Sequence, residues 1–248
     1  TMKTIRAEAS LKTPLKTSFK TALIHAALIG ATFLMLYPLL WMAASSFKPE
    51  AIIFTDLSIW PHTLDIGNYV QGWTALQESF SVFFRNSTLV ALLVVLGNTL
   101  SCSITAYAFA RLEFRGKKIW FAVMLGTLML PYHVTLIPQY VLFQKLGWID
   151  TFLPLVVPKF LAADAFFIFL MVQFFRAIPR ELDEAAVLDG CSPWRIYWKI
   201  MLPLSLPVLA TTAIFSFLWT WNDFLGPLVY LNDASLYTVP LALRSFVD

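Results

Sequence analysis

Long runs without formal charge are the feature of this sequence that most limits its fold. After Lys20 no Asp, Glu, Lys or Arg occurs until Lys48, and the stretch between Arg85 and Arg111 is equally free of charge. A helix of about 20 apolar residues is enough to cross a hydrocarbon core about 30 Å thick. Similar runs follow further along the chain. The sequence therefore predicts an all-α fold, a polytopic bundle of transmembrane helices.

Five membrane spans can be placed between the charged segments. The predicted spans are 21–44, 86–110, 119–143, 152–176 and 204–231. Prolines predict interruptions of two of them, at Pro131 and Pro138 in the third span and at Gly226-Pro227 in the fifth. We expect a separate polar N-terminal segment at 1–20 and a single transmembrane domain over 21–248.

The composition agrees with a membrane protein and disfavours several other classes. Hydrophobic residues make up 58% of the chain and charged residues only 13%, whereas a soluble domain carries about a quarter charged residues. The net charge of +3 does not indicate nucleic-acid binding, because the bases lie at span ends. Cys102 and Cys191 fall in a predicted span and in a polar loop, so we expect no disulfide between them.

The distribution of bases predicts an orientation. The N-terminal segment carries five Lys and Arg residues, the turn 111–118 carries four, and the polar stretch 176–202 carries four. The intervening loops have far fewer, and cytoplasmic loops are those enriched in Lys and Arg. We therefore expect the N-terminus and these two loops in the cytoplasm, with the loop 45–84 and the C-terminal end outside.

The most polar run in the later part of the chain is a predicted hairpin at 178–203. Pro179 and Pro203 are placed to begin helices, Gly190 to end the first short helix, and Ser192-Pro193 to cap the second. Acids gather in the first turns, where the helix dipole favours them and where they can pair with a partner's arginines. Small alanines allow close approach by another protein. The hairpin is therefore predicted to be a contact surface.

Catalytic signals are missing from the sequence pattern. There is no G-x-x-x-x-G-K-[ST] loop to cradle phosphates, which disfavours nucleotide hydrolysis by this chain. His25, His62 and His133 are too far apart in sequence to suggest a metal site. We therefore expect no enzyme activity, no catalytic residue, and neither a metal nor a cofactor held by this chain.

Polar side chains inside the predicted spans are candidates for a substrate pathway, because charges in a membrane are costly and usually functional. Lys159 and Asp164 lie five residues apart and are not expected to share a helical face. There are three structural alternatives. Lys159 extends to the membrane interface, the polar side chains pack between helices, or the tryptophans form an aromatic belt. The full candidate set is Tyr132, Gln139, Lys159, Asp164, Trp221, Asn222 and Asp223.

The hairpin resembles the signature loop of the membrane subunits of ATP-binding-cassette importers. The shared pattern is Glu184-Ala185-Ala186, then Gly190, and after nine further residues Ile200-x-Leu202-Pro203. In that family the loop forms coupling helices that dock into a cleft on the ATPase subunit. The resemblance implies a coupling role for Glu181, Glu184, Ala185, Ala186, Asp189, Gly190, Ile200, Leu202 and Pro203.

Other segments are similar to the carbohydrate branch of this family, and in particular to the shorter of two permeases, as in the maltose importer. They are Tyr37-Pro38, Arg85-Asn86-Ser87, the Tyr107–Arg111 turn and Trp221–Phe224. The resemblance implies a multi-pass subunit of a bacterial inner membrane. Its implied partners are a second, longer permease, two ATPase subunits that bind ATP and Mg²⁺, a soluble substrate-binding protein, membrane lipid and an oligosaccharide, with no nucleic acid.

Two expectations stay open at this point. Members of the family usually have six spans, so a sixth is expected after Tyr237–Pro240 in the intact member. The sequence does not name the saccharide, which can be neutral or acidic, alginate-type fragments included. An ion-gradient-driven transporter or channel subunit that uses Asp164 and Asp223 is the alternative function.

Overall fold

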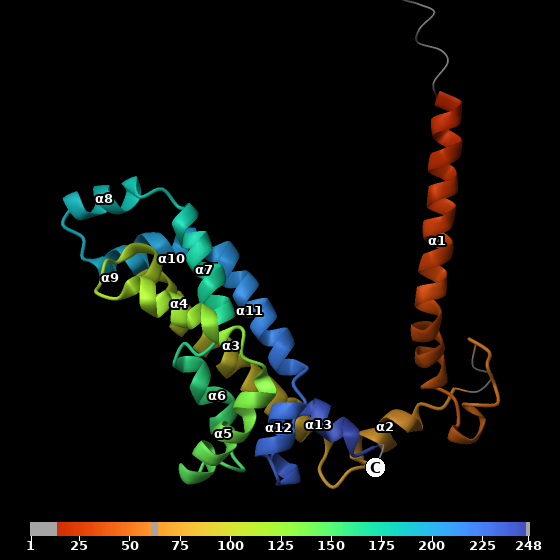
Figure 1. Cartoon of the computed structure of the whole chain (residues 1–248). Helices are drawn as coiled ribbons and strands as arrows, with labels where there is room; N and C mark the ends of the chain where they lie inside the picture. The colour runs from red at the N-terminus through yellow and green to blue at the C-terminus, as the bar shows by residue number, and fades with distance from the viewer. Residues whose placement is uncertain (1–13, 61–63, 247–248) are drawn as a thin grey trace, which may run out of the picture. The chain divides into compact units, whose positions relative to one another are not determined.

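The computed structural model describes residues 14–60 and 64–246, and the regular elements in this part of the chain are all helical (Figure 1). The predicted all-α fold is therefore confirmed. Contacts divide the chain into two compact units, residues 1–72 and 73–248, and each is described by itself. Residues 1–13 of the predicted N-terminal segment lie outside the described residues.

The first unit contains a long helix and a folded loop. Helix α1 (Pro14–Ser45) includes the predicted span 21–44, and its stretch Phe19–Ser45 is long and apolar enough to cross a membrane. A 3₁₀ turn, η1 (Glu50–Ile52), follows, and α2 (Gly67–Thr74) crosses the boundary between the two units.

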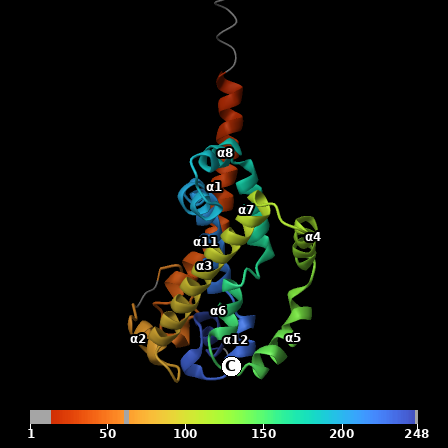
Figure 2. The ribbon, with the colours of Figure 1, turned by 90° about the vertical axis from the view of Figure 1, so that its left-hand side faces the viewer.

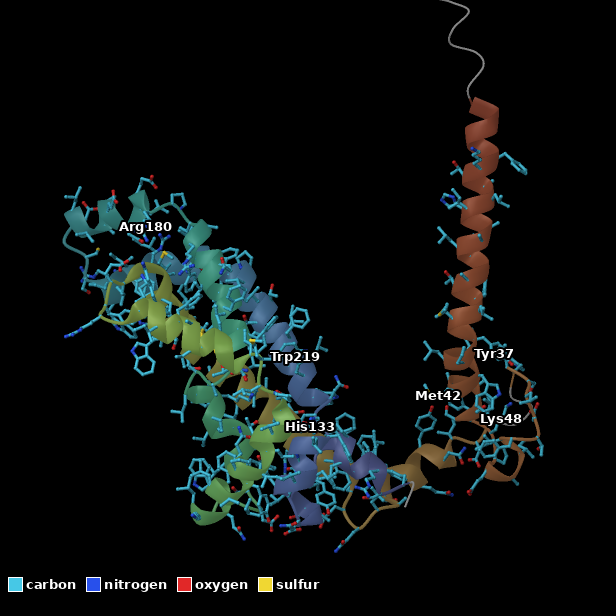
Figure 3. All side chains as sticks on the ribbon, in the orientation of Figure 1. Tyr37, Met42, Lys48, His133, Arg180 and Trp219 are labelled. Carbon is cyan, nitrogen blue, oxygen red and sulfur yellow. The ribbon has the colours of Figure 1, made fainter. Side chains whose placement is uncertain are left out.

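The loop after α1 folds around the buried ammonium group of Lys48, which is labelled in Figure 3. Lys48 is fully buried, and its Nζ donates to the carbonyl oxygens of Asp56 at 2.6 Å and Ser58 at 2.7 Å. Asn68 closes the loop by donating from Nδ2 to the carbonyls of Ser46 and Lys48. Hydrogen bonding from Ser58, followed by the charge of Lys48, lowers the pKa of the Asp56 carboxyl. Lys48 therefore serves as the internal tie of this loop.

The second unit is a bundle built on one long helix, α3. Figures 1 and 2 both place α8 at one end of this unit and α5 and α12 at the other. Its helices are α3 (Phe80–Arg111), α4 (Lys117–Thr127), α5 (Tyr132–Lys145), α6 (Leu153–Phe160), α7 (Ala165–Ala177), α8 (Glu181–Leu188), α9 (Pro193–Ile196), the π-helix η2 (Tyr197–Met201), α10 (Leu202–Leu204), α11 (Leu206–Trp221), α12 (Leu225–Tyr230), the 3₁₀ turn η3 (Ala234–Leu236) and α13 (Val239–Arg244).

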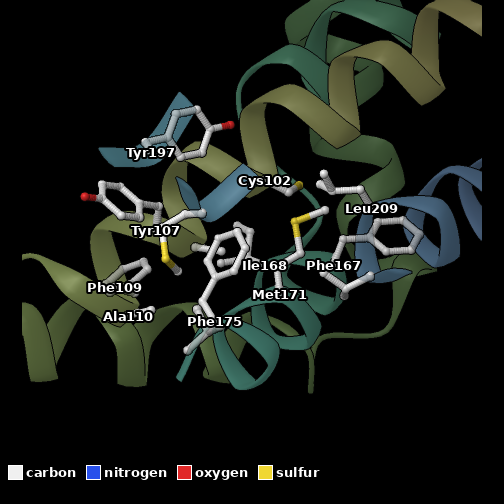
Figure 4. Close-up of a cluster of buried hydrophobic side chains, with 14 of the residues drawn as sticks. Cys102, Tyr107, Phe109, Ala110, Phe167, Ile168, Met171, Phe175, Tyr197 and Leu209 are labelled. Carbon is white, nitrogen blue, oxygen red and sulfur yellow. The ribbon is translucent and has the colours of Figure 1, made fainter. Parts of the chain in front are cut away.

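The core of this unit lies where α3 packs against α7, α11 and the hairpin. Figure 4 shows Cys102 of α3 near Met171 and Phe175 of α7, and all three side chains are fully buried. Tyr197 is also fully buried, and its hydroxyl lies 2.7 Å from Ser103 Oγ. Lipid tails are as apolar as the helix surfaces, so association in a membrane depends on close packing and interhelical hydrogen bonds of this kind.

The observed spans agree with five crossings, although two of them are bent. Three stretches, Phe19–Ser45, Phe80–Arg111 and Leu153–Ala177, can each cross a membrane alone. The pair α4 and α5 bends by 101°, and the pair Pro193–Leu204 and α11 bends by 77°. With each bent pair taken as one span, the structure has up to five candidate spans in its described part.

The predicted proline breaks are partly wrong. Pro131 does precede α5 at the bend in the third span, but Pro138 lies inside α5 without ending it. Pro203 lies in the first turn of the short helix α10, as predicted for a proline that begins a helix, and the longer α11 follows from Leu206. In the fifth span the interruption falls at residues 222–224, before Gly226 and Pro227, which lie inside α12.

An unexpected break divides the fourth span between α6 and α7. Residues 161–164 are not helical, and Ala162 has a φ of 53°. Helix α3 supports this break: Ser101 Oγ donates to the carbonyl of Lys159 at 2.7 Å. A Cβ on Gly97 would lie 2.8 Å from the ring of Phe160. Small residues on α3 therefore let the end of α6 approach its backbone.

We expect Gly97→Ala to destabilise the bundle by about 1–3 kcal/mol, because the new methyl group overpacks the contact between α3 and α6. Gly126→Ala, in α4, is the matched control: the same methyl group meets nothing within 4 Å, and a helix interior gains about 0.5–1 kcal/mol from Gly to Ala. Thermal unfolding of the two purified variants in detergent measures the difference. Equal melting temperatures would show that the contact with α6 is not tight.

Candidate functional site

The hairpin (residues 178–203) begins with α8, and Gly190 ends this helix as predicted. Gly190 has a φ of 77°, a left-handed conformation that glycine adopts without strain. The Gly190 amide donates to the carbonyl of Val187 at 3.0 Å, and the Cys191 amide donates to that of Ala186 at 2.9 Å. These two bonds form a Schellman motif. The direction of the chain after α8 therefore depends on a glycine at this position.

The second half of the hairpin starts with the predicted cap. Ser192 Oγ accepts a hydrogen bond from the Arg195 amide at 3.3 Å, and Pro193 occupies the first turn of α9. Ile200 and Leu202 are partly buried against the core of the bundle, and Pro203 is exposed. This half of the hairpin therefore fastens the loop to the bundle.

The two alanines of the sequence pattern face different ways. Ala186 is 5% exposed and belongs to the core cluster, whereas Ala185 is exposed. Glu181, Glu184, Asp189 and Gly190 are exposed as well. Ala186 thus allows α8 to lie close to its own bundle, and the other residues form the outer surface.

The predicted set of coupling residues does not include the apolar side chains on this outer surface. Leu188 is 88% exposed, Val187 is 59% exposed and Trp194 is 57% exposed. The available signal was an apolar pair at the end of a helix that is otherwise acidic. An exposed apolar tip on a polar loop is typical of a surface that another protein covers.

Arg111, the last residue of α3, ties the hairpin to the bundle. Its Nη2 donates to the carbonyl of Ile178 at 2.6 Å, and its Nε lies 3.1 Å from Asp183 Oδ2. The Arg111 side chain is only 4% exposed. The prediction that the acids pair with a partner's arginines is therefore wrong for Asp183, because this chain supplies the arginine.

The second candidate region is a cavity of about 750 Å³ in the second unit. Five of the seven predicted pathway residues line it, which are Tyr132, Gln139, Lys159, Asp164 and Asp223. Aromatic side chains complete much of the wall, among them Trp148, Trp219 and Tyr230. In this way the cavity brings together residues from α3, α5, α6, α11 and α12, and from the loop segments beside these helices.

Lys159 and Asp164 form an ion pair on the cavity wall. Lys159 Nζ lies 3.0 Å from Asp164 Oδ1 and 2.9 Å from Oδ2, and the two side chains are 31% and 27% exposed. The expectation that these residues do not meet is wrong. It assumed a continuous helix, but α6 ends at Phe160 and Asp164 turns back as the residue that precedes α7.

Trp221 and Asn222 do not line the cavity. The ring of Trp221 packs against Phe217 at 5.4 Å, and Asn222 Nδ2 donates to the carbonyl of Leu218. Trp219 lines the cavity instead. Residues two apart on a helix point about 200° from each other, so a shift from 221 to 219 changes the face. The sequence identified the aromatic cluster but not which tryptophan faces inward.

A clasp at the opposite end of the unit from the hairpin joins the loop before α6 to the loop after α12. Asp150 donates its amide to the carbonyl of Tyr230 at 2.8 Å. Its Oδ1 accepts from the amides of Asn232 and Asp233, each at 2.9 Å. No sequence pattern predicted this contact, because its two sides are far apart in the chain.

The Asp150 clasp is expected to weaken in acid. Hydrogen bonds from the Asp233 amide first, and the Asn232 amide second, lower the pKa of Asp150 from its ordinary value of 3.8. A lowered pKa in the folded state gives stability that is present above the unfolded pKa and lost as pH falls through the folded one. Asp150→Asn tolerates the φ of 62° at this position, and should speed amide exchange at residues 232 and 233.

Amide exchange followed by mass spectrometry tests this clasp, with the amides of α7 as the internal reference. The difference between wild type and Asp150→Asn should vanish as pH falls through the lowered pKa of Asp150. Identical protection of residues 232 and 233 in the two proteins above that pH would rule out a role for the carboxylate.

No three His, Cys, Asp or Glu side chains come together as possible metal ligands within residues 14–60 and 64–246. Cys102 is a free, buried thiol, and Cys191 is free and half-buried.

Comparison with known proteins identifies the family. Residues 97–246 match the family described as the binding-protein-dependent transport system inner membrane component. The chain belongs to this family. The predicted membership in a family of importer membrane subunits is thereby confirmed, and the chain is a transport subunit and a multi-pass protein of the inner membrane type.

Several known proteins are similar to this chain over most of its length. A probable ABC transporter permease of Bacillus subtilis, YurM, is 36% identical over 86% of this chain and 70% of its own length. The arabinooligosaccharides transport system permease AraQ of Halalkalibacterium halodurans is 33% identical over 87% and 77%. The trehalose/maltose transport system permease MalG of Thermococcus litoralis is 32% identical over 88% and 80%.

The fold also matches that of a solved transporter. A crystal structure of a bacterial ABC transporter involved in the import of the acidic polysaccharide alginate matches with a TM-score of 0.79. The match covers 92% of this chain and 79% of the other, at 24% sequence identity. At this identity the likeness supports the fold alone.

Proposed function

We propose that the chain is the membrane-spanning permease subunit of an ATP-driven carbohydrate importer. The observation that carries the proposal is the hairpin, whose apolar tip is exposed while Arg111 and Ala186 fasten its base to the bundle. The curated relatives add support, since two of those described above are named as permeases for arabinooligosaccharides and for trehalose and maltose.

The hairpin is the proposed docking surface for the ATPase. Leu188 and Val187 would enter an apolar cleft, and Glu181 and Glu184 would meet basic residues at its rim. Asp189, Gly190 and Ala185 complete the exposed face, and Ala186, Ile200 and Leu202 hold that face on the bundle. Pro203, which is exposed, lies beside the bend into α11. ATP and Mg²⁺ belong to two ATPase subunits, so this chain has no catalytic residue of its own.

Docking at the hairpin gives a direct mechanical route into the membrane. The helical run Pro193–Leu204 continues across a 77° bend into α11, which packs against α3 and α7. When the ATPase subunits close on ATP, the hairpin moves with their clefts, and α11 moves with the hairpin as a rigid body. Such motion would switch the pathway between inward-open and outward-open states.

The proposed positions of the remaining partners follow from the orientation of the chain in the membrane. With its basic loops inside, the chain has a cytoplasmic N-terminus and hairpin, and its outer loops receive a soluble binding protein. A second, longer permease encloses the pathway together with the single permease domain of this chain, 21–248. The cavity bearing Lys159, Asp164 and Asp223 is proposed as this chain's part of the pathway wall.

Reconstitution tests the proposal. The chain is assembled in liposomes with the second permease, the ATPase and the binding protein of the same organism, and uptake of labelled oligosaccharides is followed with and without ATP. We expect uptake that requires ATP and the ATPase. Uptake that persists without the ATPase and collapses with an ionophore would instead support the ion-gradient-driven transporter.

A further inference from the structure

The cavity wall carries an uneven set of charges. Its ionisable side chains at neutral pH are one base, Lys159, and two acids, Asp164 and Asp223. The wall therefore has a net charge of minus one. Two tyrosines and two tryptophans supply half of the other polar side chains of the lining, and Ser, Thr and Gln supply the rest, all of them uncharged.

The positive charge of the one base is already balanced within the wall, so it gives an incoming anion little net attraction. Lys159 Nζ already contacts both carboxylate oxygens of Asp164, at 3.0 and 2.9 Å. A substrate carboxylate that took over the ammonium would leave Asp164 unpaired beside it, which is strongly unfavourable away from water. Asp223 is fixed as well, because its Oδ1 accepts a hydrogen bond from the Gly226 amide at 3.1 Å.

The same groups suit a neutral sugar. Carboxylates accept hydrogen bonds from hydroxyl groups, and an ammonium has three donors to offer, so a paired Lys159 and Asp164 still bind neutral hydroxyls. Trp219 and Tyr132, which are about half exposed, add aromatic surfaces with polar handles, against which the apolar faces of sugar rings pack.

We infer that this cavity selects neutral saccharides and discriminates against uronates, with Asp223 as the residue that supplies the unpaired negative charge. The inference rests on the proposed function, since it assigns the substrate class of that same pathway. Asp223 then discriminates against substrates that carry a carboxylate, and the rest of the wall recognises hydroxyl groups.

Direct binding to the detergent-solubilised permease–ATPase complex tests the inference without the binding protein, whose own preference would mask the result. The probes are a panel of neutral trisaccharides, each paired with its counterpart oxidised to a carboxylate at C6. At least one neutral member should bind about tenfold more tightly than its oxidised counterpart, as expected for a like charge held near the ligand.

Asp223→Asn is the decisive variant, because its side-chain oxygen can still accept from the Gly226 amide. It should bring the two affinities of a pair closer by about tenfold, because it removes the negative charge that repels the carboxylate of the oxidised member. The control, Glu113→Gln, removes the same charge from an exposed side chain paired with Lys117 in the turn after α3, and should change neither affinity.

The outcomes are distinguishable. An oxidised trisaccharide that binds as tightly as its neutral counterpart, or an unchanged ratio in Asp223→Asn, would overturn the inference while leaving the proposed function in place. If no member of the panel binds to a complex that still hydrolyses ATP, the proposed carbohydrate substrate fails, and the inference fails with it.

Discussion

Replacing Gly190 with valine is expected to abolish ATP-driven uptake while the protein still inserts into the membrane. The φ of 77° at this position suits glycine, and a left-handed conformation costs an L-residue about 1–2 kcal/mol, with β-branched residues the worst case. The bonds from Gly190 and Cys191 that end α8 would be lost or distorted. The exposed tip at Leu188 would then point elsewhere and could not enter the ATPase cleft.

Gly147→Val separates this effect from strain alone. Gly147 has a φ of 69° and, like Gly190, has open space around its Cα. Gly147 lies between α5 and α6, and Figure 1 shows α5 at the opposite end of the unit from α8. Uptake into proteoliposomes and the amount of ATPase that co-purifies are measured for both variants. Co-purification and uptake at the wild-type level in Gly190→Val would contradict the coupling role.

Arg111→Ala is expected to reduce uptake by more than about tenfold, because it leaves the partly buried carboxylate of Asp183 without its partner. The hairpin would also lose the bond from Arg111 to the carbonyl of Ile178. The ATPase would still bind the exposed tip, but movement of the hairpin would no longer be transmitted to α3. ATP hydrolysis should therefore continue without matching transport.

Arg115→Ala is the matched control for the loss of the contacts between Arg111 and the hairpin. Arg115 lies four residues further along, in the turn between α3 and α4, and its side chain is exposed. The ratio of sugar transported to ATP hydrolysed is the quantity to compare. A ratio in Arg111→Ala equal to those of wild type and Arg115→Ala would mean that the hairpin needs no fastening at Arg111.

Local chemistry explains which features the sequence could predict. The spans follow from charge-free runs, and the ends of the hairpin helices follow from Gly190 and Ser192, whose effects reach only a few residues. The break in the fourth span has no such mark, since Ala162 adopts its positive φ without being glycine. It depends on contacts with Gly97 and Ser101 of α3, which are distant in sequence.

The same limit applies to the candidate site. Sequence placed Lys159 and Asp164 on one helix and so kept them apart, whereas the break brings them together. The choice between Trp219 and Trp221, and between Ala185 and Ala186, depends on which face of a helix meets the bundle. That face is set by packing partners that no local pattern encodes.

Cross-linking at the hairpin tip tests the central claim most directly. In a Cys191→Ser background the remaining thiol, Cys102, is fully buried, so a cysteine introduced at Leu188 is the accessible one. After assembly with the ATPase, a short bifunctional maleimide should join Leu188→Cys to the ATPase subunit, and should not join Leu146→Cys, which is exposed between α5 and α6. An assembled, active complex that cross-links to the ATPase from position 146 and not from position 188 would contradict the account.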